Sequence, residues 1–466
     1  MDRFSKQDIS ELQDRYYKLS PDQLINFWKA ADHAWPLAKT FLHTHTDLGS
    51  PKDSILTVEK YIQTAKAFGA HSIAITDHGD MYAVQSLYDA CQAAEIKLIV
   101  GIEFYVCDTV EDTTIKNHTR LHLIAYAKDK IGYHALARLI TASNTRIINS
   151  SFPCISKELL MKYIGPGSDG HGHIFLTSAC IGGVLTGLAF QNENNKKNAT
   201  IIKTLVDECE EKLQSMQMLE SELDKLGKQK IATKLIADKH YSKRKAETPE
   251  EIAALQKEKD ETETAKTTVK KITAQMKVIT DALSPIRQRI TAILKIPYPT
   301  TTDLATFICQ EKTTLTNIQN KVFKESDAAG LFEKEAIWYD ELAGHGNWFI
   351  EVQYHGIEME QRYMHQVVKI ARDHNIPLVA ANDAHMQLKT DAKYRKIVNS
   401  MRFNKWEDLR DGDEELYLKD DVTLFKWLSK AISQDDAAKA MINRDIIIDG
   451  CNVDFTKEKH YPKYIM

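Results

Sequence analysis

Short apolar runs alternate with longer amphipathic runs in two parts of this chain, from Thr40 to Phe190 and again after Gly330. The strand-like runs lie at 40–43, 72–76, 98–106, 121–125, 174–177, 348–353 and 377–381. The clearest helical runs between them lie at 57–68, 81–94 and 361–373. This alternation predicts an α/β fold with a parallel sheet or barrel, in which functional side chains gather at the carboxyl ends of the strands.

A heptad pattern interrupts the α/β pattern from about Gln191. Between there and Ile296 the only glycine is Gly227, and Lys, Glu, Gln and Ala dominate. Apolar residues repeat in two arms, at 205, 219, 226 and 209, 216, 223 in the first, and at 269, 276, 283, 290 and 272, 279, 286, 293 in the second. Because the turn-like segment 247–250 separates these arms, we predict an antiparallel coiled-coil hairpin. Pro285 should kink or restart the second helix.

These patterns divide the chain into five parts. Residues 1–38 are a helical lead-in, because Ser20 and Pro21 read as a helix start ahead of apolar Leu24 and Trp28. The remaining parts are the first barrel part at 39–190, the coiled-coil insertion at 191–331, the second barrel part at 332–432, and a helical tail at 433–466. We expect the last ten residues, 457–466, to be irregular.

The ends of the strand-like runs carry residues that bind metal ions. In the first run His43 and His45 are two apart, so in a strand both imidazoles lie on one face and can hold one ion. Ligand-type residues recur at the later runs, as Asp77-His78, Glu103, His122, Cys180, His355 and Asp383 with His385. A lone His or Cys is more often structural, but this repetition at successive strand ends favours a metal site.

Imidazole, carboxylate and thiolate ligands together suit Zn²⁺, Mn²⁺ or Fe²⁺ better than Ca²⁺ or a lone Mg²⁺. The candidates are too numerous for one tetrahedral ion, so we expect two or three divalent transition-metal ions that share carboxylates. Clustered ions of this kind hold a phosphate and lower the pKa of a bound water. The chemistry indicated is therefore phosphoester hydrolysis.

Charge and cysteine usage limit the class of protein. The formal net charge is −4 over 466 residues, which argues against a surface that binds nucleic acid regardless of sequence, but leaves room for a local basic groove. Seven cysteines without a CxxC motif indicate reduced thiols. The amino terminus is polar and no apolar run approaches the roughly 20 residues of a membrane span, so we expect a cytoplasmic protein with no membrane partner.

Several of these stretches resemble the PHP (polymerase and histidinol phosphatase) domain, in the version found at the amino end of bacterial DNA polymerase III alpha subunits. The resemblance covers 38–190 and 332–466. It rests on His43-Thr-His45, Ala74-Ile-Thr-Asp-His-Gly79, Gly101-Ile-Glu-Phe-Tyr105, His122-Leu-Ile-Ala-Tyr-Ala-Lys128, Leu176-Thr-Ser-Ala-Cys180, Trp338-Tyr339, Glu351-Val-Gln-Tyr-His-Gly356, Ala380-Ala-Asn-Asp-Ala-His385, Cys451-Asn-Val and His460-Tyr-Pro-Lys463.

The resemblance implies a distorted seven-stranded (β/α) barrel, similar to a TIM barrel, with a trinuclear metal site. Carried over position by position, its ligands are His43, His45, Asp53, His78, Glu103, His122, Cys180, Asp383 and His385. The spacing at Asp53 differs by about one residue from the family form, so Asp47 is the alternative there. The catalytic roles fall on Glu103, Asp383 and His78.

The resemblance also implies a reaction and partners. The leading hypothesis is a 3′–5′ exonuclease that proofreads DNA at a 3′ primer end, together with a separately encoded polymerase core or other replisome proteins. The chain stops where the polymerase palm should begin, so we expect an amino-terminal fragment or a separate subunit without polymerase activity. The alternatives are a phosphatase on a small phosphomonoester and a replisome scaffold whose metals are only structural.

Overall fold

The structure, a computed structural model, describes residues 6–31, 34–107, 120–145, 153–238, 246, 248–403, 406 and 410–455. It divides into two compact units, here called the barrel unit (Met1–Gln191 with Phe323–Met466) and the insertion unit (Asn192–Val322). Two of the expected features, the irregular end at 457–466 and the motif at 460–463, lie outside the described residues. In the part of the chain that is described, each helix is too short or too polar to cross a membrane.

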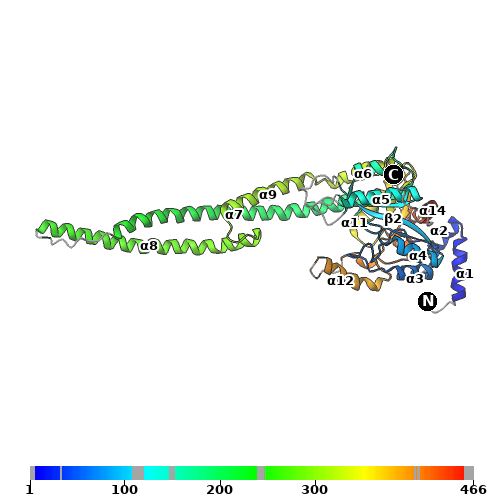
Figure 1. Cartoon of the computed structure of the whole chain (residues 1–466), viewed down its shortest axis with the longest axis horizontal. Helices are drawn as coiled ribbons and strands as arrows, with labels where there is room; N and C mark the ends of the chain where they lie inside the picture. Colours follow the sequence, from blue (N-terminus) through cyan, green and yellow to red (C-terminus); the bar gives the residue numbers. More distant parts are fainter. Residues whose placement is uncertain are drawn as a thin grey trace, which may run out of the picture. The chain divides into compact units, whose positions relative to one another are not determined.

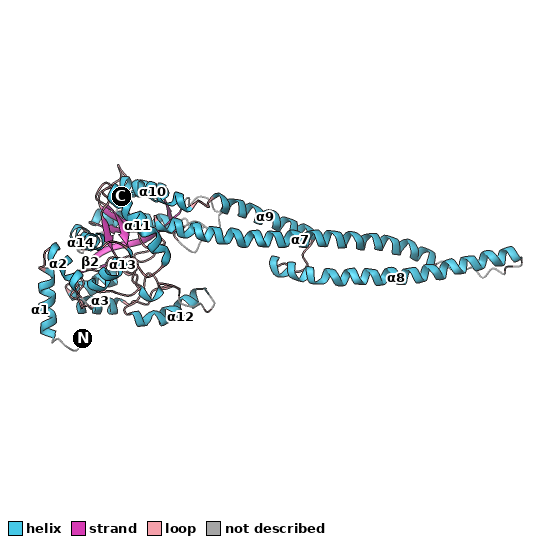
Figure 2. Cartoon of the chain, turned by 180° about the vertical axis from the view of Figure 1, so that it is seen from behind, coloured by secondary structure: helices cyan, strands magenta, loops and turns pink. Residues whose placement is uncertain are grey.

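Seven strands form the sheet of the barrel unit, drawn in magenta in Figure 2 with helices around them. They are β1 (Ser72–Ile75), β2 (Lys97–Cys107), β3 (Leu121–Ala127), β4 (Cys154–Ser156), β5 (Ile174–Thr177), β6 (Trp348–Val352) and β7 (Leu378–Ala380). The order is β1-β2-β3-β5-β6-β7, with β4 paired to β2. The sheet curls into the distorted barrel that was expected, with an insertion between β5 and β6.

The segment around His43 joins the two ends of this sheet. Phe41 O accepts from Ala74 N at 2.9 Å next to β1, and His45 N donates to Ala384 O at 2.9 Å beyond β7. The sequence predicted a strand at 40–43, and this is wrong in detail, because the structure has only an isolated bridge between Thr44 and Ala384. Thr44 N donates to the side-chain oxygen of Thr76, so a regular ladder with β1 is interrupted there.

The sheet is mixed, whereas the sequence pattern predicted parallel strands. Strand β3 runs antiparallel to both neighbours, with Tyr105 opposite His122 on the β2 side and Thr177 opposite Ile124 on the β5 side. Antiparallel neighbours need no crossover helix. The sequence showed no helical run between the segments that form β2 and β3. Strand β4 was also missed, because three residues are too few to show an apolar pattern.

The interior of the barrel has two layers, a lower apolar layer and an upper polar layer. Side chains from successive strands meet in one cluster that includes Ile99, Tyr126, Phe175, Phe349 and Val379. Because alternate residues of a strand share a face, the same inward face continues two or four residues along at Glu103, His122, Thr177, Glu351 and Asp383. The candidate site is therefore the upper layer of the barrel interior.

Helices cover the outside of the sheet and form the lead-in and tail of the barrel unit (Figure 1). They are α1 (Lys6–Tyr17), α2 (Pro21–Ala30), α3 (Val58–Ala67), α4 (Val84–Ala94), α5 (Lys130–Thr145), α6 (Lys157–Ile164), α10 (Ala328–Ala343), α11 (Glu358–Asp373), α12 (Ala392–Phe403), α13 (Asp421–Ala431) and α14 (Gln434–Gly450). Short 3₁₀ turns lie at Glu325–Asp327, Lys389–Asp391 and Asp413–Glu415. Ser20 caps α2 in a capping box with Pro21 in its first turn, as the sequence indicated.

The insertion unit contains the antiparallel hairpin and one further helix. Helix α7 (Thr186–Ala237), which begins in the barrel unit, pairs with α8 (Pro249–Leu294) through Arg289 and Glu208 at 2.7 Å. Helix α9 (Thr301–Asn320) was not foreseen, although Thr300 caps it in a capping box, and its Leu304 and Ile308 join the same apolar seam. Pro285 lies inside α8, and the helix runs through it without the predicted restart.

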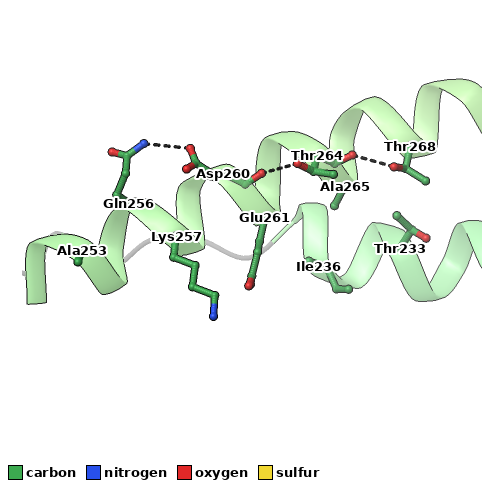
Figure 3. Close-up of a pocket in the computed structure, with 10 residues that line it drawn as sticks. All are labelled: Thr233, Ile236, Ala253, Gln256, Lys257, Asp260, Glu261, Thr264, Ala265 and Thr268. Atoms are coloured by element: carbon green, nitrogen blue, oxygen red, sulfur yellow. Dashed lines mark hydrogen bonds between the residues drawn. The ribbon is translucent and has the colours of Figure 1, made fainter. Parts of the chain in front are cut away.

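The hairpin seam is poorly filled near its turn. A hollow of about 790 Å³ lies between α7 and α8. Figure 3 shows residues that line it, among them the short side chains of Thr233, Ala265 and Thr268. The described residues that line it include Lys257, Asp260 and Glu261, and among them there is no histidine or cysteine. Among the described residues, the groups of side chains that could hold a metal ion lie in the barrel unit.

Candidate metal centre

Glu103 lies at the centre of the site and is completely buried. It lies in the middle of β2. The chain beyond β1 pairs with β2 at this point, where His78 and Glu103 form an isolated parallel bridge. Its Oε2 atom lies 2.6 Å from His78 Nδ1. Its Oε1 atom lies 3.0 Å from His122 Nδ1 and 3.4 Å from His43 Nε2. His45 Nε2 lies 3.6 Å from Oε2, so one carboxylate contacts four imidazoles, which come from the segment around His43, from the residues after β1 and from the start of β3.

The antiparallel direction of β3 explains why His122 is part of the site. His122 is the second residue of β3, at the strand's amino end, whereas its neighbours bring their residues from carboxyl ends. Because β3 runs opposite to β2, its beginning lies beside the end of β2, at the pair Tyr105 and His122. Both kinds of strand end therefore meet at the same mouth of the barrel.

Asp383 forms a second centre beside the first. Its Oδ1 atom lies 3.1 Å from His43 Nε2, 3.1 Å from His45 Nε2 and 3.0 Å from His385 Nε2. The residue has a φ of +50°, in the left-handed region that side chains other than glycine rarely adopt. Aspartate tolerates this conformation better than most residues, and here it directs the carboxylate into the cluster.

Asp53 and Cys180 lie at the edges of the cluster. Asp53 Oδ2 is 3.2 Å from His78 Nε2, and its Oδ1 is 3.7 Å from His385 Nδ1. The Cys180 Sγ atom is 3.5 Å from His122 Nδ1. Asp47, the alternative to Asp53, is half-exposed, and the charged group that acts on its carboxylate is Lys60. The geometry therefore favours Asp53 over Asp47.

Charges in the cluster are strongly coupled. Burial would raise the pKa of Glu103 and of Asp383, but the neighbouring imidazoles hold both pKa values well below their usual range. Burial, together with repulsion from His78 and His385, lowers the pKa of His45 to about 3. Burial also lowers the pKa of His385. Two of the five imidazoles are thus neutral at pH 7, the form that binds metal ions.

The cluster fits metal ions better than it fits a hydrogen-bond network. Three groups of its side chains each place one donor atom within 4.8 Å of one another, namely His45, His78 and His385, then His43, His45 and Asp383, and then His78, Glu103 and His122. Both Glu103 oxygens and the Nδ1 atoms of His78 and His385 are buried and lack a partner with hydrogen-bond geometry. Lone pairs that converge without sharing hydrogens are typical of metal ligands.

A second layer of polar side chains, which the sequence analysis did not place in the site, orients these residues. Glu351 Oε1 accepts from His43 Nδ1 at 2.7 Å, and the amide nitrogen of Gln353 lies 3.0 Å from the same atom. These residues alternate on β6 and its continuation, so both face inward. Two polar residues, two apart, in the otherwise apolar run 348–353 were the available signal.

Asp77 holds the turn that follows His45. Its carboxylate accepts hydrogen bonds from Thr46 N at 2.6 Å and from the Ser50 hydroxyl at 2.8 Å. Gly49 is required in this turn, since a Cβ there would lie 2.4 Å from Asp77 Oδ2. Ser50 Oγ also accepts from His78 N at 3.1 Å, so one turn fixes the backbone next to two of the imidazoles.

His355, which the sequence marked as ligand-type, lies outside the cluster. Its Nδ1 atom is 2.7 Å from Glu360 Oε1, and its Nε2 atom is 3.0 Å from the carbonyl oxygen of Asn382. Asn382 also donates to Tyr417 O at 2.6 Å. These bonds use both ring nitrogens of His355 and fix the residue before Asp383, so its role is structural.

A hollow of about 260 Å³ opens at one side of the cluster. Lys52, Asp53, His78, Tyr105 and Asn144 are among the residues that line it. The Tyr105 ring stacks on the His78 imidazole, with ring centroids 5.5 Å apart. Side chains of Asp53 and His78 are 13% and 12% exposed, whereas Glu103 is at 0%, so a ligand in this hollow would meet Asp53 and His78 first.

Comparison with known proteins places this chain near one family. Residues 42–220 match the family model described as the PHP domain. The range contains seven of the nine predicted ligands, and Asp383 and His385 lie beyond it.

Curated relatives include DNA polymerase III alpha subunits. The one from Campylobacter jejuni is 35% identical over 144 residues, which is 31% of this chain and 11% of the relative. The one from Aquifex aeolicus is 32% identical over 218 residues, 43% of this chain and 18% of the relative. A PolC-type DNA polymerase III from Thermotoga maritima is 43% identical over 76 residues, 16% of this chain and 6% of the relative. The chain thus spans less than a fifth of the length of these relatives.

Among solved structures, a chain from Bifidobacterium adolescentis, provisionally described as a metal-dependent phosphoesterase, aligns with 85% of this chain and 97% of its own length. The identity is 14% and the TM-score 0.28, which is too low to support an argument about fold or function.

Proposed function

This chain carries a PHP domain at residues 42–220, and we propose from that premise that its nine clustered side chains form the centre of a metal-dependent phosphoesterase. The finer proposal is a 3′–5′ exonuclease that acts on the 3′ end of a DNA primer. The observation that carries both is the cluster of five imidazoles, three carboxylates and a thiol around the buried Glu103, with contacts such as Glu103 Oε2 to His78 Nδ1 at 2.6 Å.

The residues that would hold two or three ions are the nine predicted from the sequence. Glu103 contacts four imidazoles and Asp383 contacts three, so each is suited to bridge neighbouring ions. Divalent transition-metal ions bound there would supply an acidified water and positive charge for the phosphoryl oxygens. The same donor set accepts Zn²⁺, Mn²⁺ or Fe²⁺.

The chain's own residues have separable tasks in this proposal. Glu351 accepts a hydrogen bond from His43 Nδ1, so the other ring nitrogen, Nε2, is directed at Asp383 and Glu103 with its lone pair. The Asp77 turn keeps His45 and His78 in place. The partly exposed His78 and Asp53 border the hollow, so they are the residues nearest to an entering phosphoester.

The relatives support DNA as the substrate, and the size of the hollow is compatible with one nucleotide. A volume of about 260 Å³ is at the small end for ligand pockets, so it suits the terminal nucleotide of a chain and not a duplex. The curated relatives are replicative DNA polymerase subunits, which supports a role with a primer end and with replisome partners. A small phosphomonoester remains the competing substrate.

A substrate comparison tests the proposal. Metal-loaded protein is given a 3′-mismatched labelled primer on a template and, separately, a set of phosphomonoesters such as p-nitrophenyl phosphate. Release of 3′ nucleotides from the primer, faster than release of phosphate from the monoesters, is the expected result. The reverse preference would favour the phosphatase, and a metal-loaded protein that is inert towards every ester would favour a scaffold.

A further inference from the structure

Helix α12 carries an exposed strip of apolar and aromatic side chains. Tyr394, Ile397 and Met401 are 53%, 46% and 76% exposed, and their spacing puts them on one face of the helix. Leu388 before the helix and Trp406 after it are 54% and 70% exposed. We call these five residues the α12 strip. In Figures 1 and 2, α12 lies at the edge of the barrel unit.

The opposite face of α12 is fixed against the candidate site. Arg395 is 6% exposed, and its Nε atom donates to the carbonyl oxygen of Asp53 at 2.7 Å. Its guanidinium also contacts Asp413 Oδ1 at 2.9 Å. Since Asp53 lines the hollow, α12 borders the loop through which a ligand would reach the cluster. The strip begins at Leu388, three residues after His385.

The strip is flanked by positive charge. The segment 389–406 contains six Lys or Arg residues and one Asp, in a chain whose net charge is −4. Lys393 Nζ lies 5.0 Å from the centroid of the Tyr394 ring, and Lys396 Nζ lies 4.9 Å from that of the Trp406 ring. Exposed aromatic rings set among cations are the combination that binds single-stranded nucleic acid, because bases stack on the rings while phosphates pair with the cations.

We propose that the α12 strip binds the single-stranded end of a DNA chain and leads its 3′ terminus to the hollow beside Asp53 and His78. This inference rests on the proposed function for its direction and its end point. The occupant follows from charge complementarity, since Lys393 and Lys396 lie beside the aromatic rings of the strip and would pair with phosphates, and from the continuity between α12 and the Asp53 loop. A basic groove is compatible with the acidic net charge because it is local.

Binding can be measured without hydrolysis. The full-length protein is titrated into a labelled oligodeoxythymidylate, and binding is followed by fluorescence anisotropy at several salt concentrations. A chelator is present so that no hydrolysis occurs. The double substitution Tyr394→Ala with Trp406→Ala should weaken binding by at least about tenfold, because each stacked base is worth roughly five- to hundredfold in affinity. Tyr394→Phe with Trp406→Phe keeps both rings and should bind within about twofold of the wild type.

Two further variants serve as tests of charge and of specificity. The first removes two cations beside the strip, and the second removes an exposed ring elsewhere. Lys393→Gln with Lys396→Gln should lower the slope of log affinity against log salt by about 1.4, the value for two phosphate contacts on a single strand. Tyr298→Ala removes a ring that is 94% exposed in the insertion unit, and it should bind as the wild type does. With a primer substrate, the two alanine substitutions in the strip should raise KM and leave kcat nearly unchanged.

The result that overturns the inference is a Tyr394→Ala, Trp406→Ala protein that binds the oligonucleotide as tightly as the wild type, or a wild type that does not bind it. Light scattering that shows a dimer in the wild type and a monomer in this variant would overturn it as well, in favour of a second copy on the strip. A wild type that binds through the strip but hydrolyses no phosphoester sinks the proposed function alone. A protein that trims primers regardless of the strip sinks the inference alone.

Discussion

The Nδ1 atom of His43 lies 2.7 Å from the Oε1 atom of Glu351, a residue 308 positions further along the chain. Both side chains are completely buried. The contact places a carboxylate behind an imidazole whose other nitrogen faces Glu103 and Asp383 at 3.4 and 3.1 Å. Arrangements of this kind fix the orientation of a metal-binding histidine and make it a stronger ligand.

Glu351→Gln should therefore weaken metal binding without unfolding the barrel. The amide keeps the shape and can still form a hydrogen bond with His43, but it carries no negative charge. We therefore expect about a 10- to 100-fold loss of metal affinity. Competition with a fluorescent chelator measures the affinity. The matched control is Glu358→Gln, a similar change on the exposed start of α11, which should have no effect. Equal affinities for all three proteins would show that Glu351 has no such role.

Asp383→Asn should lower the rate of phosphoester hydrolysis by at least about 10²-fold, because it removes charge from a group that contacts three imidazoles. The fold should persist, since asparagine also tolerates the φ of +50° at this position. A 3′-labelled primer assay with Mn²⁺ measures the rate, and circular dichroism is the folding control. If the variant trims the primer at the wild-type rate, the activity comes from a contaminant or from another site.

Metal binding should release protons and should strengthen as pH rises. Burial alone would lower the pKa of His43 and of His78, but nearby groups, Asp383 for His43 and Tyr105 and Asp53 for His78, raise both above the usual range. Without metal these imidazoles hold protons at neutral pH, and a metal ion must displace them. Calorimetric titration in two buffers of different ionisation enthalpy counts the protons.

The metal content is checked on the same protein. Elemental analysis after gentle purification should find two or three ions per chain, since nine donors are too many for one. One ion or none, or binding that is independent of pH between about 6 and 8, would contradict the assignment of these imidazoles as ligands.

The insertion unit should be removable at the boundaries that the structure gives. Its apolar seam joins α7, α8 and α9 through residues such as Cys209, Ile279 and Leu304, all within Asn192–Val322. Replacing 192–322 by a Gly-Ser linker should leave the metal content and the melting temperature of the barrel unit unchanged. Replacing only 192–296, the part with the heptad pattern, leaves α9 with Leu304 and Ile308 exposed, so that protein should aggregate. Loss of metal in the first protein would place the insertion in the barrel's core.

Features that depend on neighbouring residues in the chain were determined by the sequence. The heptads of the hairpin follow from the period of apolar residues, and the start of α2 follows from Ser20 and Pro21. The strand-like runs that end in His78 and Asp383 were recognisable because apolar residues precede a ligand-type residue. The resemblance then supplied Asp53, which composition and periodicity alone would not have chosen over Asp47.

Tertiary structure decided what depends on direction and on distant partners. Apolar periodicity is the same for either direction of a strand, so it could not show that β3 runs antiparallel and brings His122 to the mouth by its amino end. It could not show that 41–45 joins β1 to the residues after β7, or that Glu351 stands behind His43. Such contacts form only when the barrel closes, because closure brings together polar groups that lie far apart in the chain, such as His43 and Glu351, and most buried polar groups in a folded protein are paired.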